Sequence, residues 1–401
     1  MASGNYLVLK VNGQEAYVRK DRLDELRKVD GVVFDCDGVL VDVRGSYNRA
    51  ISKTSAYILE GLTGIPVDEN FVSDEVIFLF RRTGGFNCDR DTVYGIVMFM
   101  LMKLPEEIRM KLRKLVQTVE WQPDAFERFS RLKKLVKETL KPVELNEKFF
   151  EGFVDELKKF TERLDASGVD SVDRDLAPHR SVSQDDFYTS IKRFLLYPGD
   201  VGESVVSTVF EEFFCGPALF KKTYGIEPKF NSAPGMVENE TVIIQAETLD
   251  RLAAVLGKRN IGIASGSRFE PRRQVLNGLL SKFNREALVF VEVVEKAERE
   301  LSNSDCAEVN LKKPHPFSLI KSAEGFGGFV YALYVGDSME DALMVEEARK
   351  RDPRYLFAGV YRFSGVDDVV RRIFLNSDCD MVIPSVNELP FVLEKVRRLK
   401  N

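Results

Sequence analysis

The C-terminal part of the chain alternates short apolar runs with segments of helical spacing. The apolar runs lie at 261–265, 287–294, 331–336, 355–360 and 380–384. Segments such as ETLDRLAAVLGKR and MEDALMVEEARKR lie between them and repeat their apolar residues at helical intervals. Short apolar runs of this kind are typical of buried strands. Strands that alternate with helices form parallel βαβ units, so we predict an α/β fold with a doubly wound parallel sheet.

Another apolar run, GVVFD at 31–35, is separated from the others by a long region of helical spacing. We therefore predict a Rossmann-like α/β core from 31–43 and 240–401, interrupted by an all-helical insertion at 44–239. Extra helices and a polar loop are expected at about 104–190, with the loop at 165–186. Residues 1–30 are predicted as an extension, in which Asn12-Gly13 indicates a hairpin followed by a short helix. The sequence leaves open whether this hairpin packs on the core or on a partner.

Composition narrows the possible functions of this chain of 401 residues. A net charge of -5 gives no basic excess for nucleic-acid binding, and no segment has membrane-spanning length. The 5 cysteines form no CxxC pair, which favours a reducing, cytoplasmic location. With only 2 histidines, a metal must be held by carboxylates, so we expect a hard cation such as Mg²⁺.

The first chemistry-bearing segment, DCDGV, follows the run at 31–35 and contains Asp35 and Asp37. Residues i and i+2 of an extended segment point to the same side, so the two carboxylates can face one substrate. Gly38 permits a sharp turn directly after them, which allows backbone N–H groups to approach a phosphate.

Three further segments place polar residues at or near the ends of predicted strands. Ser265 and Gly266 in IASGSR offer a hydroxyl and N–H groups for an anion, although Ser265 could simply cap a helix. Lys313 precedes a proline, and Asp337 and Asp341 lie in YVGDSMEDA. In parallel sheets ligands bind beyond the carboxyl ends of the strands, so we expect these groups to converge. Phosphoryl transfer requires such an inventory, although Asp341 could instead be a first-turn helix charge.

The order DxDGVLxD, KP and GDxxxD resembles the haloacid dehalogenase-like superfamily, most of whose members are Mg²⁺-dependent phosphatases. The resemblance implies that Asp35 is the nucleophile and becomes an aspartyl-phosphate. It implies that Asp37 protonates the leaving group and then activates water, and that Ser265 and Lys313 bind the phosphate. Mg²⁺ would be held by Asp35, the backbone carbonyl of Asp37 and Asp337, with Asp341 in support.

The helical insertion is similar to the cap domains that this superfamily places after its first motif. DVRGSYNRAI and RRTGGFNCDRD resemble a functionally unassigned subgroup of capped members. On this basis Arg81, Arg82 and Asn87 are candidate substrate contacts in the cap. The alternative is that RRTGGFN is only a turn that ends a helix.

The favoured hypothesis is a cytoplasmic phosphatase that acts on a small phosphorylated metabolite, without nucleic-acid or membrane partners. A phosphomutase would use the same two acids, Asp35 and Asp37, but return the phosphoryl group to the substrate. A phosphonate-cleaving enzyme would need a Schiff-base lysine in the cap, and dehalogenase chemistry would have no use for Asp37. A non-catalytic binding module on the same fold is the remaining alternative. The oligomeric state does not follow from the sequence.

Overall fold

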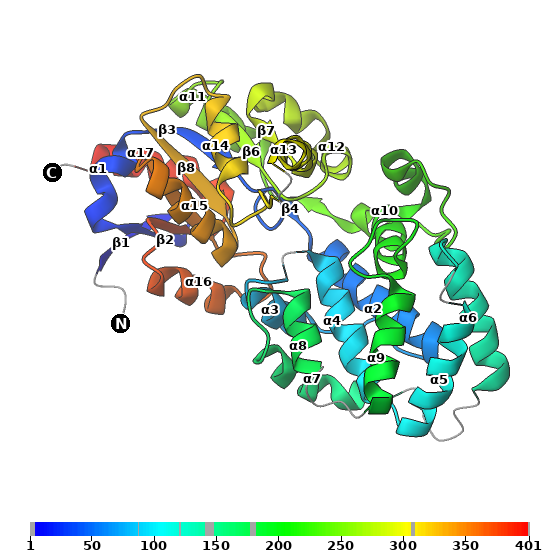
Figure 1. Ribbon diagram of the computed structural model, residues 1–401. Coiled ribbons are helices and arrows are strands. Elements are labelled where there is room, and N and C mark those ends of the chain that lie inside the picture. The colour runs from blue at the N-terminus through cyan, green and yellow to red at the C-terminus, as the bar shows by residue number, and fades with distance from the viewer. Residues whose placement is uncertain are drawn as a thin grey trace. The chain divides into compact units, whose positions relative to one another are not determined.

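A computed structural model gives the fold, and it describes residues 5–86, 88–119, 122–140, 148–176, 182–305 and 309–399. The chain divides into two compact units (Figure 1). Residues Met1–Arg44 and Glu240–Asn401 form one, called here the core unit, and Gly45–Asn239 form the other, the helical unit. The predicted N-terminal extension, 1–30, therefore belongs to the core unit.

The core unit contains all the described strands and eight of the described helices. The strands are β1 (Tyr6–Val11), β2 (Gln14–Arg19), β3 (Val29–Phe34), β4 (Val41–Asp42), β5 (Thr241–Val242), β6 (Ile261–Ala264), β7 (Leu288–Val289), β8 (Tyr331–Gly336), β9 (Tyr355–Val360) and β10 (Met381–Ile383). The helices are α1 (Leu23–Arg27), α11 (Ala246–Leu256), α12 (Phe269–Leu276), α13 (Val291–Asp305), α14 (Phe317–Glu324), α15 (Met339–Arg351), α16 (Asp367–Asn376) and α17 (Leu389–Arg398).

The helical unit contains the remaining described helices. These are α2 (Arg49–Thr63), α3 (Asp74–Arg82), α4 (Asp89–Met102), α5 (Glu106–Val119), α6 (Ala125–Thr139), α7 (Val154–Thr161), α8 (Val169–Leu176), α9 (Val182–Leu195) and α10 (Val205–Tyr224), the last broken at Gly216.

Both units also contain short helical turns. Short 3₁₀ turns lie at Lys20–Arg22, Glu151–Phe153, Met236–Asn239, Asn277–Lys282, Arg285–Ala287 and Val386–Glu388, and a π-helical turn lies at Arg44–Asn48.

Eight of the described strands form one sheet in the order β1-β2-β10-β9-β8-β3-β6-β7. From β10 to β7 every neighbouring pair is parallel. The N-terminal hairpin β1–β2 adds to this sheet, because β2 pairs antiparallel with β10. The predicted α/β fold with a parallel sheet is confirmed, and the hairpin packs on the core. Strand β3 lies between β8 and β6, so the DCDGV segment leaves the middle of the sheet.

Helices cover both faces of the sheet. On one face, Phe34 of β3, Leu252 of α11 and Leu393 of α17 belong to one buried apolar cluster. The other face meets its helices through glycines, because a Cβ at Gly262 would lie 2.5 Å from Ser322 Oγ of α14. Side chains alternate between the faces along a strand, so buried strands with two covered faces read as nearly continuous apolar runs.

The predicted strand at 287–294 is wrong for most of its length. Only Leu288–Val289 is strand, and α13 begins at Val291. Val294 and Ala297, three residues apart, pack in one apolar cluster with Val289. This spacing places side chains on one face of a helix, so the run of valines continues the helix rather than the strand.

The predicted polar loop at 165–186 is also wrong, because it contains α8 and the start of α9. Helix α8 is short and polar, but its side chains are engaged. Ser171 Oγ donates a hydrogen bond of 2.6 Å to Gly168 O, and Val172 is fully buried. Tertiary contacts therefore stabilise this short helix, although the polar composition of the segment favoured a loop.

Helix α4 forms the apolar centre of the helical unit. Every residue from Thr92 to Leu101 is buried, so the helix is covered on all sides. A helix that is apolar all round is typical of the core of a large domain or of a membrane span. No helix in the described part of the chain is long and apolar enough to cross a membrane.

The two glycines of GGFN, Gly84 and Gly85, lie in a sharp turn after α3, and Gly85 packs closely against the chain just before α8. A Cβ at Gly85 would lie 2.4 Å from both Asp165 O and Gly168 N. Gly84 has a φ of +80°, in the left-handed region that glycine tolerates. Both glycines therefore have a structural reason in this turn. Asn87 lies outside the described residues.

Replacing Gly85 by alanine should lower the free energy of unfolding of the helical unit by about 1–3 kcal/mol, because the new Cβ overlaps backbone atoms. Gly152→Ala is the matched control, since nothing lies within 4 Å of a Cβ there. Urea denaturation of the full chain, followed by circular dichroism, measures both changes. Equal effects of the two substitutions would contradict the close approach at Gly85.

Candidate functional site

The DCDGV segment forms a tight turn directly after β3. Asp35 N donates a hydrogen bond of 2.9 Å to Val335 O, and Gly38 N donates one of 2.9 Å to Val41 O. Gly38 has a φ of +70°, and a Cβ there would lie 2.0 Å from Asp337 Oδ2. Glycine is therefore required at this position both by the backbone and by the approach of Asp337.

Three carboxylates meet where β3 and β8 end. One oxygen each of Asp35, Asp337 and Asp341 lies within 4.8 Å of the others. Asp35 is 8% exposed and Asp341 is 1% exposed, so two of the three acids are buried. Buried carboxylates of like charge need a cation, and hard oxygen donors suit Mg²⁺. The donor set therefore fits the expected metal.

Lys313 supplies a positive charge at the same place. Its Nζ lies 3.0 Å from Asp35 Oδ2 and 2.8 Å from Asp341 Oδ1, and it donates a hydrogen bond of 2.8 Å to the hydroxyl of Tyr334. The Tyr334 hydroxyl in turn lies 3.0 Å from Ala264 O and 3.2 Å from Asp341 Oδ1. Residues from the turn after β3, from β8, from α15 and from the segment before α14 thus form one hydrogen-bonded network.

The network shifts the pKa values of its members. Burial raises the pKa of Asp35 to about 6; Lys313 opposes this shift, and Asp341 and Asp37 add to it. Burial by itself lowers the pKa of Lys313, but the charges of Asp341 and Asp35 outweigh it and raise that pKa well above its usual value. Lys313 is therefore an ammonium group that faces two acids.

Asp341 has two structural roles, one for each carboxylate oxygen. Its Oδ2 accepts hydrogen bonds of 2.8 Å from Ser338 Oγ and 3.3 Å from Ser338 N, which completes a capping box at the start of α15. Its Oδ1 faces Lys313 and Tyr334. The two alternatives for this residue, a helix first-turn charge and a member of the site, are therefore compatible.

Asp37 lies in the same turn but is held by other residues. Ser267 Oγ donates a hydrogen bond to Asp37 Oδ2, and Arg272 Nε lies 3.3 Å from Asp37 Oδ1. Arg272 also forms a bidentate ion pair with Glu240, at 2.6 Å and 2.9 Å. The side chains of Arg272 and Glu240 are both fully buried, whereas that of Asp37 is 29% exposed.

Ser265 and Gly266 lie in the loop that carries Ser267 to Asp37. Ser265 N donates a hydrogen bond of 2.9 Å to Val289 O, and Ser265 Oγ accepts one of 3.3 Å from Ser267 N. No heavy atom lies within 4 Å of a Cβ built at Gly266, so the loop is open there. The alternative of Ser265 as a helix N-cap is not what is observed, because α12 begins later, with Arg268 at its N-cap position.

The sequence predictions missed four residues of this site, which are Ser267, Arg272, Glu240 and Tyr334. Tyr334 lies in the correctly predicted strand β8, where a tyrosine is a common residue. Nothing in the sequence therefore indicated that its hydroxyl faces the site. Arg272 and Glu240 are charged residues in segments rich in charge, where an exposed position is the usual expectation. Ser267 had a weak signal, since it follows Ser265 in SGS.

The predicted cap contacts belong to the helical unit. Arg81 lies at the end of α3, where its Nη2 is 2.7 Å from Asp89 Oδ1, and Arg82 is exposed. The contact with Asp89 gives Arg81 a local structural role. A role of Arg81, Arg82 and Asn87 toward a substrate stays a prediction.

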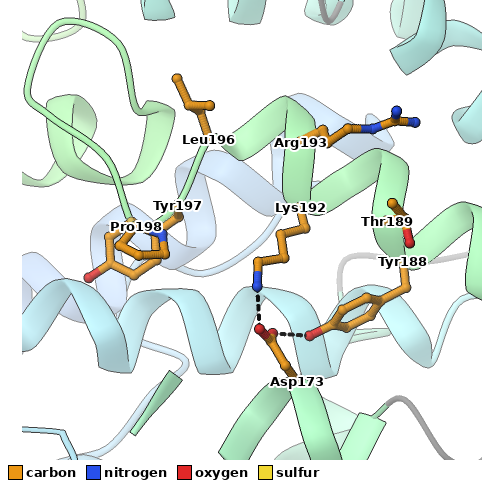
Figure 2. A pocket seen from close by; sticks show the side chains of 8 residues that line it. All are labelled: Asp173, Tyr188, Thr189, Lys192, Arg193, Leu196, Tyr197 and Pro198. Carbon is orange, nitrogen blue, oxygen red and sulfur yellow. Dashed lines mark hydrogen bonds and ion pairs between the residues drawn. The ribbon is translucent and has the colours of Figure 1, made fainter. Parts of the chain in front are cut away.

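The helical unit also contains a cavity of about 420 Å³ that includes none of the predicted site residues. Figure 2 shows Asp173 between Lys192 and Tyr188, both of which bind its carboxylate. Tyr94 also donates a hydrogen bond of 2.8 Å to Asp173. The carboxylate of Asp173 is thus paired with Lys192 and hydrogen-bonded to two tyrosines, as expected for a partly buried network that joins α8 to α9.

Comparison with known proteins shows the fold. No protein-family model and no curated protein matches this chain. The X-ray structure of target ZR25 of the Northeast Structural Genomics Consortium aligns with 92% of this chain and 99% of its own, with a TM-score of 0.62 and 16% identity. Phosphatase Tt82 from Thermococcus thioreducens aligns with 90% of this chain and 98% of its own, with a TM-score of 0.48 and 20% identity. The likeness to ZR25 indicates a shared fold.

Replacing Tyr334 by phenylalanine should lower the free energy of unfolding by about 1–3 kcal/mol, because buried hydrogen bonds to Lys313 and Asp341 lose their hydroxyl. Tyr331→Phe in the same strand is the control, since its hydroxyl bonds no described residue. We expect the control to change stability by less than about 0.5 kcal/mol in urea denaturation. A Tyr334→Phe protein as stable as the control would contradict the network.

Proposed function

We propose that this protein is a Mg²⁺-dependent phosphatase of the haloacid dehalogenase-like type, which hydrolyses a small phosphorylated metabolite through an aspartyl-phosphate. The observation that carries the proposal is that Asp35, Asp337 and Asp341 lie together at the strand ends and that Lys313 pairs with two of them, Asp35 and Asp341. Hydrolysis of a phosphate ester needs a nucleophile, a cation and a proton donor in one place. Asp35, Lys313 and Asp37 are the groups proposed for these three roles.

The first chemical step uses Asp35 and Asp37. A carboxylate oxygen of Asp35 forms a bond to phosphorus while the ester P–O bond breaks, and the electron pair of that bond goes to the leaving oxygen. The carboxylic proton of Asp37 goes to the same oxygen, so an alcohol departs. Asp37 is proposed for this role because it lies in the same turn as Asp35 and its side chain is 29% exposed, whereas Asp35 and Asp341 are buried.

The second step releases phosphate from Asp35. The ionised Asp37 takes a proton from water, the oxygen of that water bonds to phosphorus, and the bond from Asp35 to phosphorus breaks with its electron pair. Asp35 returns as a carboxylate and Asp37 is protonated again, so the cycle closes. Splitting the reaction in this way replaces one difficult step by two easier ones.

Lys313, Ser265 and Gly266 are the groups proposed to bind the phosphate. The ammonium of Lys313 already faces Asp35, so it would lie beside the transferred group. Ser265 offers its hydroxyl, and the open loop at Gly266 offers a backbone N–H to an anion. Asp35, Asp337 and Asp341, with the backbone carbonyl of Asp37, would hold Mg²⁺. When bound, the ion offsets the negative charge of the phosphoryl oxygens.

Substrate selection is assigned to the helical unit, as in the cap domains that the sequence resembles. Arg81, Arg82 and Asn87 are the proposed contacts to the part of the substrate beyond the phosphate. A phosphomutase would use Asp35 and Asp37 in the same way but would pass the phosphoryl group to a second hydroxyl. A binding module would hold a phosphate without turning it over.

The activity can be tested by phosphate release from a panel of sugar phosphates, phosphoglycerates, nucleotides and p-nitrophenyl phosphate. We expect release with Mg²⁺ and none after chelation with EDTA. Asp35→Asn should reduce kcat by at least about 10³-fold, because the amide is not a nucleophile. Asp30→Asn, in β3 but before the site, is the matched control.

Other outcomes favour the alternatives. A rearranged phosphate ester without free phosphate would indicate a phosphomutase. Binding of phosphate esters by the folded protein without turnover, unchanged in Asp35→Asn, would contradict the enzyme and favour a binding module.

The metal site can be tested separately through Gly38. Gly38→Ala should weaken Mg²⁺ binding by at least about 10-fold, because the new Cβ overlaps Asp337 Oδ2 and must displace that carboxylate. Gly278→Ala is the control, as nothing lies within 4 Å of its Cβ. Titration calorimetry measures the affinity, and circular dichroism shows whether each variant is folded. An unchanged Mg²⁺ affinity in folded Gly38→Ala would contradict a metal role for Asp337.

A further inference from the structure

We infer that Arg272 is a positioning residue for Asp37, and that Glu240, the first residue of the core unit after the helical unit, holds Arg272 in place. The inference rests on the proposed function and adds two residues to it. Neither residue belongs to the motifs that carry the family resemblance. The contact of Arg272 Nε with Asp37 Oδ1, at 3.3 Å, is its starting point.

The ion pair between Arg272 and Glu240 is fully buried and bidentate. Burying two charges costs several kcal/mol per ion before their mutual attraction is counted, so a buried pair is weak evidence for a purely stabilising role. Arg272 lies on α12, where its Nη1 and Nη2 face Glu240 and its Nε lies beside the partly exposed Asp37. This buried ion pair therefore lies directly beside the proposed proton donor, Asp37.

Glu240 fixes the orientation of the Arg272 guanidinium group. Its two carboxylate oxygens accept hydrogen bonds from Nη1 and Nη2 of Arg272, at 2.6 Å and 2.9 Å. A bidentate pair of this kind fixes the plane of the guanidinium group. The position of Nε beside Asp37 Oδ1 is therefore fixed as well.

Two contacts define the orientation of the Asp37 carboxyl group. Ser267 Oγ donates to Oδ2, and Arg272 Nε lies beside Oδ1. Both residues follow β6 in the segment that also carries Ser265. The same loop and helix would thus bind the phosphate and orient the proton donor, which keeps the distance between them fixed.

The backbone connects Glu240 to the turn that carries Asp37. Glu240 directly precedes β5, and β5 pairs antiparallel with β4 through Val41↔Val242 and Asp42↔Thr241. Strand β4 follows the DCDGV turn, whose Asp37 forms a bridge with Val41. The two chain crossings between the units are therefore tied to each other and, through Glu240 and Arg272, to Asp37.

The test compares two esters that differ in their need for a proton. The leaving group of an alkyl phosphate departs as an alkoxide unless Asp37 protonates it. The leaving group of p-nitrophenyl phosphate, nitrophenolate, departs readily without a proton. In Arg272→Met/Glu240→Gln, which removes both buried charges, kcat/KM for the alkyl phosphate should fall by about 10²-fold, and that for p-nitrophenyl phosphate by less than about 10-fold. Arg272→Lys, which keeps the charge but loses the planar fork, should shift the ratio in the same direction.

A control pair with the same bidentate geometry is available in the same unit. Arg251 and Glu394 form a partly exposed pair at 2.6 Å and 2.7 Å between α11 and α17. Arg251→Met/Glu394→Gln should leave the ratio of the two kcat/KM values unchanged. In an Asp37→Asn background, the Arg272→Met/Glu240→Gln change should also leave the ratio unchanged, because the group that it positions can no longer donate.

The outcomes separate this inference from the proposed function. If the wild type releases no phosphate with Mg²⁺, both are overturned. If the wild type is active and the folded Arg272 variants lose kcat/KM equally for both esters, the positioning role is overturned and the proposed phosphatase activity stands. A shift of the ratio that persists in the Asp37→Asn background would also overturn it, since the effect would then bypass Asp37.

Discussion

The burial of Lys313 between Asp35 and Asp341 is the interaction on which the site depends. An ammonium group with little access to water is stable only when acids surround it, and the two carboxylates are stable only because Lys313 faces them. Their contact joins the end of β3 to the first turn of α15 and to the segment before α14. The hydroxyl of Tyr334 joins β6 to the same network through Ala264 O. Elements far apart in the sequence are thus fixed by one set of charges.

A second set of charges lies around Asp37 and differs from the first in its partners. Around Asp35 the positive charge of Lys313 is shared by two acids, whereas around Asp37 the charge of Arg272 is already offset by Glu240. The proposed nucleophile and the proposed proton donor therefore lie in different electrostatic environments although only Cys36 separates them in the chain. Environments that differ in this way allow neighbouring acids to take different roles. The β4–β5 pairing connects the second set to both crossings of the chain.

Much of the core could be predicted because its strands are short, buried on both faces and bounded by glycine or proline. The strands β6, β8, β9 and β10 lie within predicted runs, and β3 begins at Val29, two residues before its run. The exception, 287–294, failed because valines are enriched in strands, whereas here Val294 packs against Val289 from one face of a helix. In the helical unit α8 was missed because its many polar residues favoured a loop, whereas buried Val172 and the hydrogen bonds of Ser171 and Asp173 hold it as a helix. The proposed site residues at strand ends were predictable from chain order, since parallel strands bring their carboxyl ends to one edge.

The sequence by itself determined the α/β class, the place of the helical insertion in the chain and the convergence of Asp35, Asp337 and Asp341, because these follow from local periodicity and strand direction. Only the tertiary structure decided which charges pair. Tyr334, Arg272 and Glu240 lie in segments whose pattern is the same whether their polar groups face solvent or the site. Their roles depend on distances between residues tens to hundreds of positions apart, and a local pattern contains no such distance. The physical reason is that a charge can be buried only when oppositely charged or hydrogen-bonding groups surround it, and the tertiary fold determines which groups those are.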